Sequence, residues 1–329
     1  MSFRLSERVR RAVYGVAAHP AAGLAALLFV SFAWGAGYVG TGTAIRDGFG
    51  PLWFQSTRLF AAASLLGGVA WYQGYRFPRL RSAALSGVLA WAIASGSQTL
   101  AQQSITPGTA ALVMGTGPLV AVGMDSLLRR ARPLGHELAG LAMGLVGLAL
   151  LIGGSPQLDP AVFLLLLACV AWSSSSVIEA RRNDGSHPLA VASLQMFAGA
   201  SGLALVALLS GEALPHPGLH GALGWGWLGF VCAGIGMPLW LWVLRVLPMS
   251  TVMLQASLSP LAAALLGAVL MGERWNAAGL VGMVLIALSA AITVAWPKLW
   301  AQWQRRLLSG RTASPLAPPR SRWRRVRQG

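Results

Sequence analysis

The sequence consists of long apolar runs separated by short clusters of arginine, proline and polar residues. A membrane-spanning helix needs about 20 predominantly apolar residues, whereas the strands of a membrane barrel give alternating segments of about ten. We therefore predict an all-α polytopic membrane protein with ten transmembrane helices. The predicted spans are 22–45, 51–74, 82–102, 107–127, 134–154, 160–180, 188–210, 222–245, 250–271 and 276–296.

The composition supports this fold class and excludes several others. Of the 329 residues, 55% are hydrophobic and only 10% are charged, whereas soluble domains carry about 25% charged residues. The formal net charge of +16 comes from arginines at the predicted helix ends and in the tail, so it does not predict nucleic-acid binding. The two cysteines lie inside apolar runs without metal-ligand spacing, and we predict neither a metal site nor a cofactor.

Basic residues fix the predicted orientation. With ten spans, all but three of the 25 Lys and Arg residues fall in loops and tails on one side. The exceptions are Arg46, Arg274 and Arg58, and only Arg58 lies within a span. Since cytoplasmic loops accumulate basic residues, we place both termini in the cytoplasm, with an N-terminal tail at 1–20 and a C-terminal tail at 298–329. The basic C-terminal tail should attract the anionic inner leaflet.

The sequence also contains a weak internal repeat. The segment AWGAGYV at 33–39 recurs as AWSSSSV at 171–177, and Thr109, Pro118 and Gly140 match Thr251, Pro260 and Gly282 at one constant offset. Five helices per copy is an odd number, so the second copy must enter the membrane in the opposite orientation. We predict two inverted five-helix repeats, 21–155 and 156–297, an arrangement typical of alternating-access transporters.

These features resemble the EamA-type transporters of the drug/metabolite transporter superfamily. The resemblance is best over 244–288, which contains a small-residue helix, Pro260 and a Gly-Glu-Arg turn, and it extends to Trp34 with Gly35 and to Pro51 with Arg58. The first repeat departs from the pattern, because Arg130 and Ala131 stand opposite Gly272 and Glu273. The resemblance implies a secondary transporter that exports or exchanges small metabolites, including amino-acid-like and drug-like solutes. The preference for arginine over lysine is typical of a GC-rich bacterial genome and favours a bacterial inner membrane.

The first helix of each repeat supplies candidate substrate-binding residues. Trp34 and Tyr38 lie on one face of the first helix, and Trp172 and Ser176 occupy matching positions in the sixth. They predict two facing walls of a cavity in which aromatic rings stack on a solute. Tight helix packing, which small and hydroxyl residues also promote, is the alternative.

Buried amides and one arginine extend the candidate site. Gln98, Gln102, Gln195 and Gln255 lie within predicted spans, where an unpaired amide costs several kcal/mol and therefore needs a protein partner, water or ligand. Interhelical hydrogen bonding is the alternative for each amide. Arg58 could bind a substrate carboxylate, or its long side chain could reach the outer interface.

Two prolines lie near the centres of the fourth and ninth spans. Pro118 and Pro260 each lack an N–H and release the carbonyl four residues earlier, so we predict a hinge in each repeat. A static kink that only improves packing is the alternative. Because no Asp, Glu or His lies securely at the midplane, the sequence does not support proton antiport, and it leaves downhill export or exchange open.

A membrane enzyme acting on a lipid-soluble substrate is the alternative from another functional class. Such an enzyme needs a nucleophile with a base, a carboxylate pair or metal ligands within the membrane. The five histidines lie in predicted loops or tails or, in the case of His136, at the very start of a predicted span, and HExxH and GxSxG motifs do not occur. We therefore expect no catalytic residues, a small-molecule substrate and membrane lipids as partners, and a monomer or homodimer.

Overall fold

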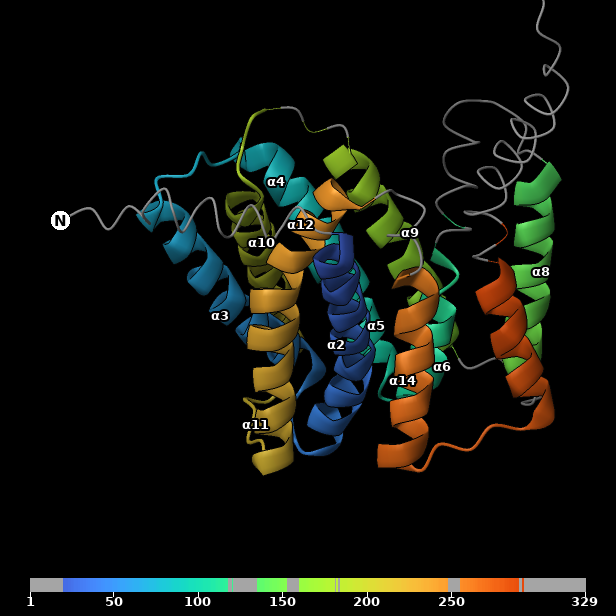
Figure 1. Ribbon diagram of the computed structural model, residues 1–329. Helices are drawn as coiled ribbons and strands as arrows, with labels where there is room; N and C mark the ends of the chain where they lie inside the picture. Colours follow the sequence, from blue (N-terminus) through green and yellow to red (C-terminus); the bar gives the residue numbers. More distant parts are fainter. Residues whose placement is uncertain are drawn as a thin grey trace, which may run out of the picture.

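The computed structural model describes residues 20–117, 120, 135–152, 160–180, 182, 184–247, 255–289 and 292, and regular structure in these ranges is entirely helical (Figure 1). The helices are α2 (Pro20–Arg46), α3 (Pro51–Tyr72), α4 (Leu80–Gly87), α5 (Gly96–Ala101), α6 (Pro107–Met114), α8 (Gly135–Ile152), α9 (Ala161–Ala180), α10 (Pro188–Ser210), α11 (Leu219–Gly226), α12 (Met237–Val246), α14 (Gln255–Met271) and a helix over Ala277–Ser289. Two π-helical segments, η1 (Val88–Ser95) and η2 (Trp227–Gly236), join α4 to α5 and α11 to α12.

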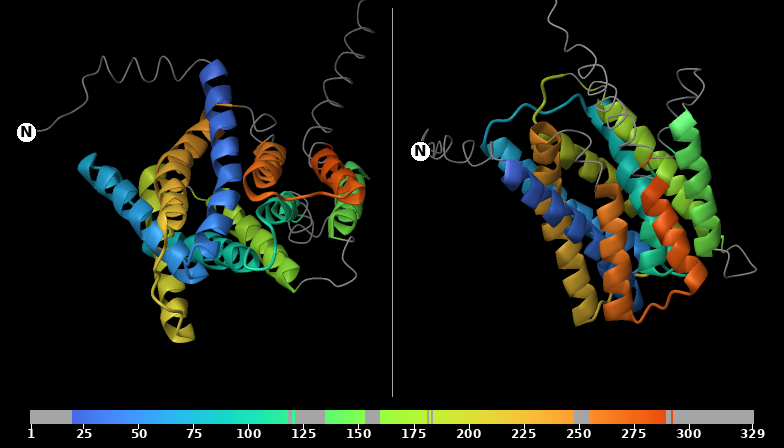
Figure 2. Two further views of the ribbon diagram at one scale, coloured as in Figure 1. Left: turned by 90° about the horizontal axis from the view of Figure 1, so that it is seen from below. Right: turned by 45° about the vertical axis from the view of Figure 1, so that its right-hand side comes forward.

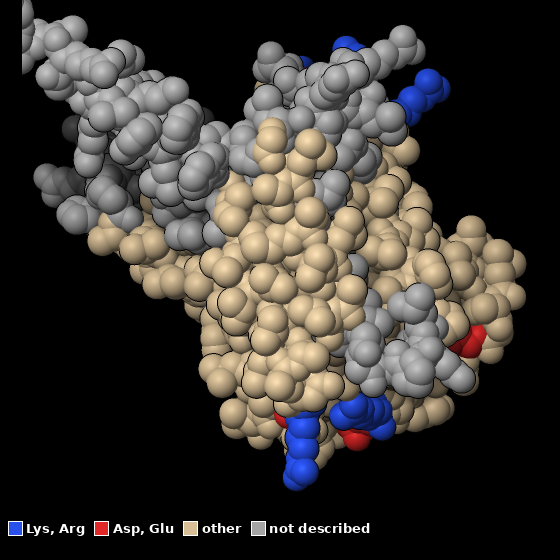
Figure 3. Space-filling model, turned by 90° about the vertical axis from the view of Figure 1, so that its right-hand side faces the viewer, with Lys and Arg blue, Asp and Glu red and all other residues tan. Residues whose placement is uncertain are grey.

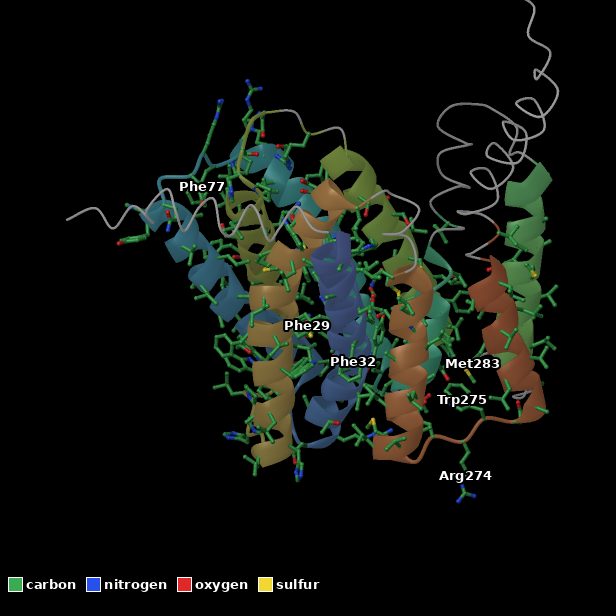
Figure 4. The ribbon with its side chains drawn as sticks, viewed as in Figure 1. Phe29, Phe32, Phe77, Arg274, Trp275 and Met283 are labelled. Atoms are coloured by element: carbon green, nitrogen blue, oxygen red, sulfur yellow. The ribbon has the colours of Figure 1, made fainter. Side chains whose placement is uncertain are left out.

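The described helices fit a lipid environment. Three described helical stretches are long and apolar enough to cross a membrane: Ala21–Arg46, Pro188–Ser210 and Leu219–Trp240. The third runs from α11 through η2 into α12, and shorter apolar helices accompany these stretches. Large apolar side chains such as Phe29 and Phe32 of α2 are exposed (Figure 4). In the face that Figure 3 shows, blue side chains lie at the two ends, and most of the described surface between them is uncharged, with red side chains near the lower end and at one edge. The chain is thus a polytopic helical membrane protein.

Proline and glycine set the helix boundaries at matching places in the two halves of the chain. Proline is favoured in the first turn of a helix, because the N–H group that it lacks would have no partner within the helix there. A glycine with positive φ can end a helix without steric cost. Pro51 and Pro188 begin α3 and α10, and Gly74 and Gly211 follow their ends with φ of 66° and 68°. Pro188 follows Pro51 in the sequence at the same distance as Gly211 follows Gly74.

The two π-helical segments also match. Each occupies the middle of the third helix in its half, and a π-helix is rare enough that a matched pair is informative. Segment η1 packs against α9, and η2 packs against α2. Each π-helical segment therefore contacts the first helix of the other half, as expected for two related bundles that clasp one another.

Close packing of the two halves is concentrated along two helix pairs. Helices α3 and α10 share a core that includes Leu59, Ala62, Met196 and Ala200. Helix α2 packs against α14 at Gly35, where an added Cβ would lie 2.6 Å from the Ser259 carbonyl oxygen and 2.7 Å from the Ala262 Cβ. Only glycine fits this crossing without a shift of one helix.

The ends of the bundle differ in charge. We call the end containing Asp47, Glu212 and Glu273 the carboxylate end, and the end containing Arg76, Arg79 and Arg182 the arginine end. Helices α3, α6 and α11 begin at the carboxylate end, which is lowermost in Figure 1 and faces the viewer in the left panel of Figure 2. Arg274 points away from the bundle there (Figure 4).

Candidate functional site

The π-helical segment η2 and the following α12 hold Trp34. The Trp34 Nε1 donates to the Cys232 carbonyl oxygen at 3.2 Å, and the Trp34 ring centroid lies 5.4 Å from that of Trp240. In return, the Trp227 Nε1 of η2 donates to the carbonyl oxygen of Ala33 at 3.2 Å. Trp34 remains partly exposed, so its ring is oriented by the other half of the chain without being enclosed by it.

The matching tryptophan, Trp172 of α9, contacts η1. Its ring meets Trp91 edge to face, with centroids 5.9 Å apart. Tyr38 packs against a cluster from α5, α6 and α9 that includes Val113 and Leu165, and it is partly exposed. The three predicted aromatic residues therefore border the contacts between the halves.

The hydroxyl groups near these rings have partners within their own helices, both for the predicted Ser176 and for two further residues of α2. Ser176 is exposed, and its hydroxyl donates to the Trp172 carbonyl oxygen at 2.9 Å. Ser31 and Thr41 are buried and donate to carbonyl oxygens of α2 one turn earlier, at 2.7 and 2.9 Å. Their donor capacity is used within their own helices, so the aromatic rings carry more of the candidate site than the hydroxyls do.

Arg58 is buried inside the bundle instead of reaching its surface. Only 4% of the residue is exposed, and its Nη2 donates to the Ser95 hydroxyl at 3.1 Å. The guanidinium carbon lies 6.0 Å from the centroid of the Phe54 ring, within cation–π range. Its Nε finds no acceptor, and in the described ranges no carboxylate pairs with it. The structure thus favours an interior role for Arg58 over contact with the outer interface.

The predicted glutamines fall into different environments. Gln195 is buried and donates through Nε2 to the Ser86 hydroxyl at 3.0 Å, which is the interhelical hydrogen bond of the alternative interpretation. Gln102 is only 6% exposed, yet neither of its amide atoms has a partner among the described residues. Gln98 and Gln255 are partly exposed. Gln102 is therefore the strongest of the four as a group that needs a ligand or water.

Sequence reasoning missed Gln55, which is fully buried one turn before Arg58 on α3. Its Nε2 donates to the Ser95 carbonyl oxygen at 3.1 Å and to the Thr99 hydroxyl, while its Oε1 has no partner in the part of the chain that the structure describes. The spacing of three residues between Gln55 and Arg58 is the signal that could have found it, because residues three apart share a helix face.

Of the two predicted hinge prolines, the structure describes Pro260. Pro260 lies inside α14 and faces α6, since a Cβ added at Gly115 would lie 3.0 Å from the Pro260 Cγ. Its position places a proline at a contact between the two halves. Pro118 lies outside the described residues.

Three carboxylates at the carboxylate end bind the first turns of helices in the opposite half. The Glu212 carboxylate accepts from the Trp53 N–H at 2.8 Å and from the Leu52 N–H at 3.1 Å, at the start of α3. Glu273 and Asp47 similarly accept from backbone N–H groups of α6 and α11, at 3.1 and 2.6 Å. A carboxylate near a helix N-terminus satisfies free N–H groups and complements the helix dipole. No sequence pattern predicted these three contacts.

Glu273 is half-buried, and burial affects its charge. Burial raises the pKa of its carboxyl, and the hydrogen bond from the Gly108 N–H opposes that rise. Its Oε2 has no partner within the described ranges, and an added Cβ at Gly108 would collide with this oxygen. The glycine is therefore required for the carboxylate to approach the α6 terminus.

The arginine end contains a cavity of about 640 Å³ lined by Arg76, Arg79, Arg182 and Asp184, among others. Arg182 forms ion pairs with Glu179 at 2.7 Å and with Asp184 at 3.3 Å. The hydroxyl and N–H of Ser186 hold the pKa of Asp184 down at about 2. These contacts connect the loop after α9 to the start of α4, because Arg182 also donates to the Ser82 hydroxyl at 2.9 Å.

In the described ranges, no group of three His, Cys, Asp or Glu side chains is placed to hold a metal ion. The candidate site therefore consists of aromatic rings, amides and one arginine around the contacts between α2, α3, α9 and the two π-helical segments. Such a lining can stack on a solute and hydrogen-bond it.

Comparisons with known proteins agree with this architecture. The model of the EamA-like transporter family matches residues 21–153 and again 159–295. The uncharacterized inner membrane transporter YedA of Escherichia coli K12 is 30% identical over 287 residues, which cover 83% of this chain and 92% of YedA. The uncharacterized protein PA1977 of Pseudomonas aeruginosa is 29% identical over 233 residues, covering 67% of this chain and 76% of that protein.

A solved structure titled "Crystal structure of protein" shares the fold, with a TM-score of 0.61 and 20% sequence identity over 90% of this chain and all of that one. The match to a transporter family argues against the alternative function of a membrane enzyme with a lipid-soluble substrate. Two family matches together cover nearly all of the helical part of the chain, and the resemblance seen in the sequence is confirmed. The chain belongs to the EamA-like transporter family.

Proposed function

We propose that this chain is a secondary transporter that exports or exchanges small solutes across a bacterial inner membrane by alternating access. The matched π-helical segments carry the proposal, because each packs against the first helix of the other half. This two-fold relation is expected of ten helices arranged as two inverted five-helix repeats at 21–155 and 156–297. The two family matches and the inner-membrane relative support the same arrangement.

The proposed orientation puts the arginine end in the cytoplasm. Basic residues accumulate in cytoplasmic loops, and Arg76, Arg79 and Arg182 all lie at this end. The tails at 1–20 and 298–329 then share the cytoplasmic side, and the carboxylate end faces the periplasm. In this orientation, the contacts of Glu212, Glu273 and Asp47 close the periplasmic side and must break when that side opens.

The proposed binding site lies between the first helices and the π-helical segments. Trp34, Tyr38 and Trp172 offer partly exposed rings, and Gln102 offers a buried amide that no described residue hydrogen-bonds. Pro260 and the π-helical segments lack regular α-helical bonding, so they are the places where rearrangement costs the least hydrogen bonding. Rocking of one repeat against the other would then expose the site to each side in turn.

Solute counterflow in proteoliposomes tests this proposal with a panel of amino acids and amphiphilic drugs. We expect Trp34→Ala and Trp172→Ala to abolish counterflow while leaving the detergent-purified protein monodisperse. Trp71→Ala is the matched control, because Trp71 is 81% exposed and lies near the end of α3, and it should retain wild-type rates. Unchanged transport by both site variants would remove the rings from the binding site.

The proposed transport is downhill or by exchange, without proton coupling. Within the described ranges, the acidic residues lie near helix ends, at Asp47, Glu137, Glu179, Asp184, Glu212 and Glu273. An intramembrane proton relay needs a titratable group along the pathway. A pH gradient imposed across proteoliposomes should therefore not concentrate any transported solute, and concentrative movement would refute this coupling.

A further inference from the structure

The cavity at the arginine end lies outside the proposed solute-binding site. It has a volume of about 640 Å³ and lies between the loop that leads into α4 and the loop that joins α9 to α10. Pockets of about 300–1,000 Å³ are typical of sites for small ligands. The charged side chains in its described lining are three arginines and one aspartate, Arg76, Arg79, Arg182 and Asp184. This lining is cationic and favours an anionic occupant.

Contacts between the two loops hold the cavity in shape. The His187 N–H donates to the Arg76 carbonyl oxygen at 2.9 Å, and the His187 ring stacks on the Tyr75 ring with centroids 3.6 Å apart. A Cβ added at Gly185 would lie 3.7 Å from the Arg76 Nη1, so the guanidinium of Arg76 lies over the loop between α9 and α10. One loop belongs to each half of the chain, and the cavity therefore lies where the halves meet (Figure 1).

The three arginines contribute to the cavity in different ways. Arg182 is held by Glu179 and Asp184, and only 9% of its side chain is exposed. Arg76 and Arg79 are exposed, so a ligand in the cavity can reach their guanidinium groups. A guanidinium group can donate two parallel hydrogen bonds to a phosphate. Arg182 therefore shapes the cavity, and Arg76 and Arg79 are placed to bind an anion.

The start of α4 adds positive potential to the same cavity. Ser82 of its first turn lines the cavity, and its hydroxyl accepts from Arg182 at 2.9 Å. Arg79 precedes the helix with extended backbone, and its side chain forms no capping hydrogen bond in the described part of the chain. The first turn of a helix favours a nearby anion, because its N–H groups and the helix dipole point that way. The helix thus reinforces the preference that the arginines establish.

Apolar side chains border the cavity as well. Phe77 and Ile178 line it, and Phe77 lies at this end of the bundle in Figure 4. Phe77 and the nearby Leu80 are both exposed. Trp71 and Tyr72, at the end of α3 that leads to this loop, are also exposed, and such rings are common at a membrane interface. Guanidinium groups beside exposed apolar side chains suit an amphiphile with an anionic headgroup.

We propose that this cavity binds the headgroup of an anionic phospholipid. Arg76 and Arg79 bind the phosphate oxygens, and the acyl chains lie along Phe77 and Leu80. Basic pockets between membrane helices bind anionic headgroups in other membrane proteins. The bound lipid joins the loops of the two halves and strengthens their contact at this end. The site is for a lipid and not for the transported solute, so the proposal does not rest on the transport function.

Thermal unfolding of the full-length protein in dodecyl maltoside tests the site. Dioleoylphosphatidylglycerol is titrated into the protein, and dioleoylphosphatidylcholine is the control with the same acyl chains and no net charge. A ligand that binds only the folded state raises the unfolding temperature as its concentration increases. We expect saturable stabilisation and an apparent affinity at least about tenfold higher for the anionic lipid, because its net charge attracts both exposed arginines.

Variants distinguish the cavity from diffuse attraction to basic loops and tails. Arg76→Gln and Arg79→Gln should each weaken binding of the anionic lipid by about tenfold or more, because each removes hydrogen bonds to a charged group. Arg81→Gln is the matched control, since Arg81 is exposed in the first turn of α4 but does not line the cavity. Its loss should weaken binding by no more than about fivefold, the contribution of one basic residue to diffuse attraction.

Inorganic phosphate distinguishes a lipid from a soluble anion. It offers the same oxygens without acyl chains, so it should stabilise the protein far less than the lipid does at the same concentration. Phe77→Ala should weaken binding of the lipid and leave the effect of phosphate unchanged. Stabilisation by phosphate that equals stabilisation by the lipid would show that the cavity takes a soluble anion, and would overturn the proposal.

Two further results would also overturn it. These are equal stabilisation by the two lipids, and equal losses of affinity in Arg76→Gln, Arg79→Gln and Arg81→Gln. Either result would leave the transport function untouched. If a variant is not recovered as a monodisperse protein, native mass spectrometry of the wild type decides. Retention of one phosphatidylglycerol from an equimolar mixture of the two lipids supports the proposal, and retention without preference refutes it.

Discussion

Replacing Glu212 should loosen the first turn of α3, although Glu212 lies far from that turn in the sequence. Gly50, the residue before α3, has no side chain with which to cap the helix, and Pro51 occupies the first turn. The Glu212 carboxylate takes over this role by accepting from the N–H groups of Leu52 and Trp53. The Trp53 Nε1 also donates to the Glu212 backbone carbonyl oxygen at 3.0 Å, a contact that substitution of the side chain leaves in place.

The expected loss of stability follows from the two hydrogen bonds that the Glu212 carboxylate accepts. Hydrogen bonds to a charged group contribute about 1.5–3 kcal/mol and neutral ones about 0.5–1.5 kcal/mol. Glu212→Gln keeps an acceptor oxygen but loses the charge and its interaction with the helix dipole, so we expect a loss of roughly 1–2 kcal/mol, or about 5- to 30-fold in local opening. Glu212→Ala leaves both N–H groups without this acceptor and should cost about 2–4 kcal/mol.

Hydrogen–deuterium exchange of the detergent-purified protein measures this opening directly. Peptides that contain the amides of Leu52 and Trp53 should lose protection in the order Glu212→Ala, Glu212→Gln, wild type. Glu273→Gln is the matched control, because it removes the corresponding charge at Gly108 on α6 and should leave α3 protected. Equal protection of the α3 amides in all proteins would refute the claim that this carboxylate caps the helix.

Two further predictions concern a helix crossing and a loop carboxylate. Gly35→Ala should destabilise the protein by about 1–3 kcal/mol, because the added Cβ would overlap α14, whereas Gly68→Ala meets no neighbour within 4 Å and should be neutral or mildly stabilising in thermal unfolding. Wild-type Asp184 has a depressed pKa, so its stabilising contribution is present above about pH 3.9 and is lost as the pH falls toward about 2. Ser186→Ala should raise that pKa toward its ordinary value, and a carboxyl chemical-shift titration that still reports about 2 would show that Ser186 is not the cause.

The candidate site was only partly predictable. Helical spacing selected Trp34, Tyr38 and Trp172, and these rings do border the contacts between the halves. The same reasoning gave Gln195 and Ser176 equal weight, although the structure provides each with a protein partner. Sequence spacing identifies residues on one helix face, but it does not show which neighbour satisfies a polar group, because that neighbour comes from another helix.

The sequence alone determined where most of the described helices lie, because a bilayer imposes a length of about 20 apolar residues and because proline and glycine act locally at helix ends. Only the tertiary structure decided that Arg58 is interior, that Gln55 accompanies it at Ser95, and that Glu212 caps α3. These facts depend on contacts between residues distant in the chain. Each arises when whole helices pack and bury polar groups together, and a local pattern does not encode the partner.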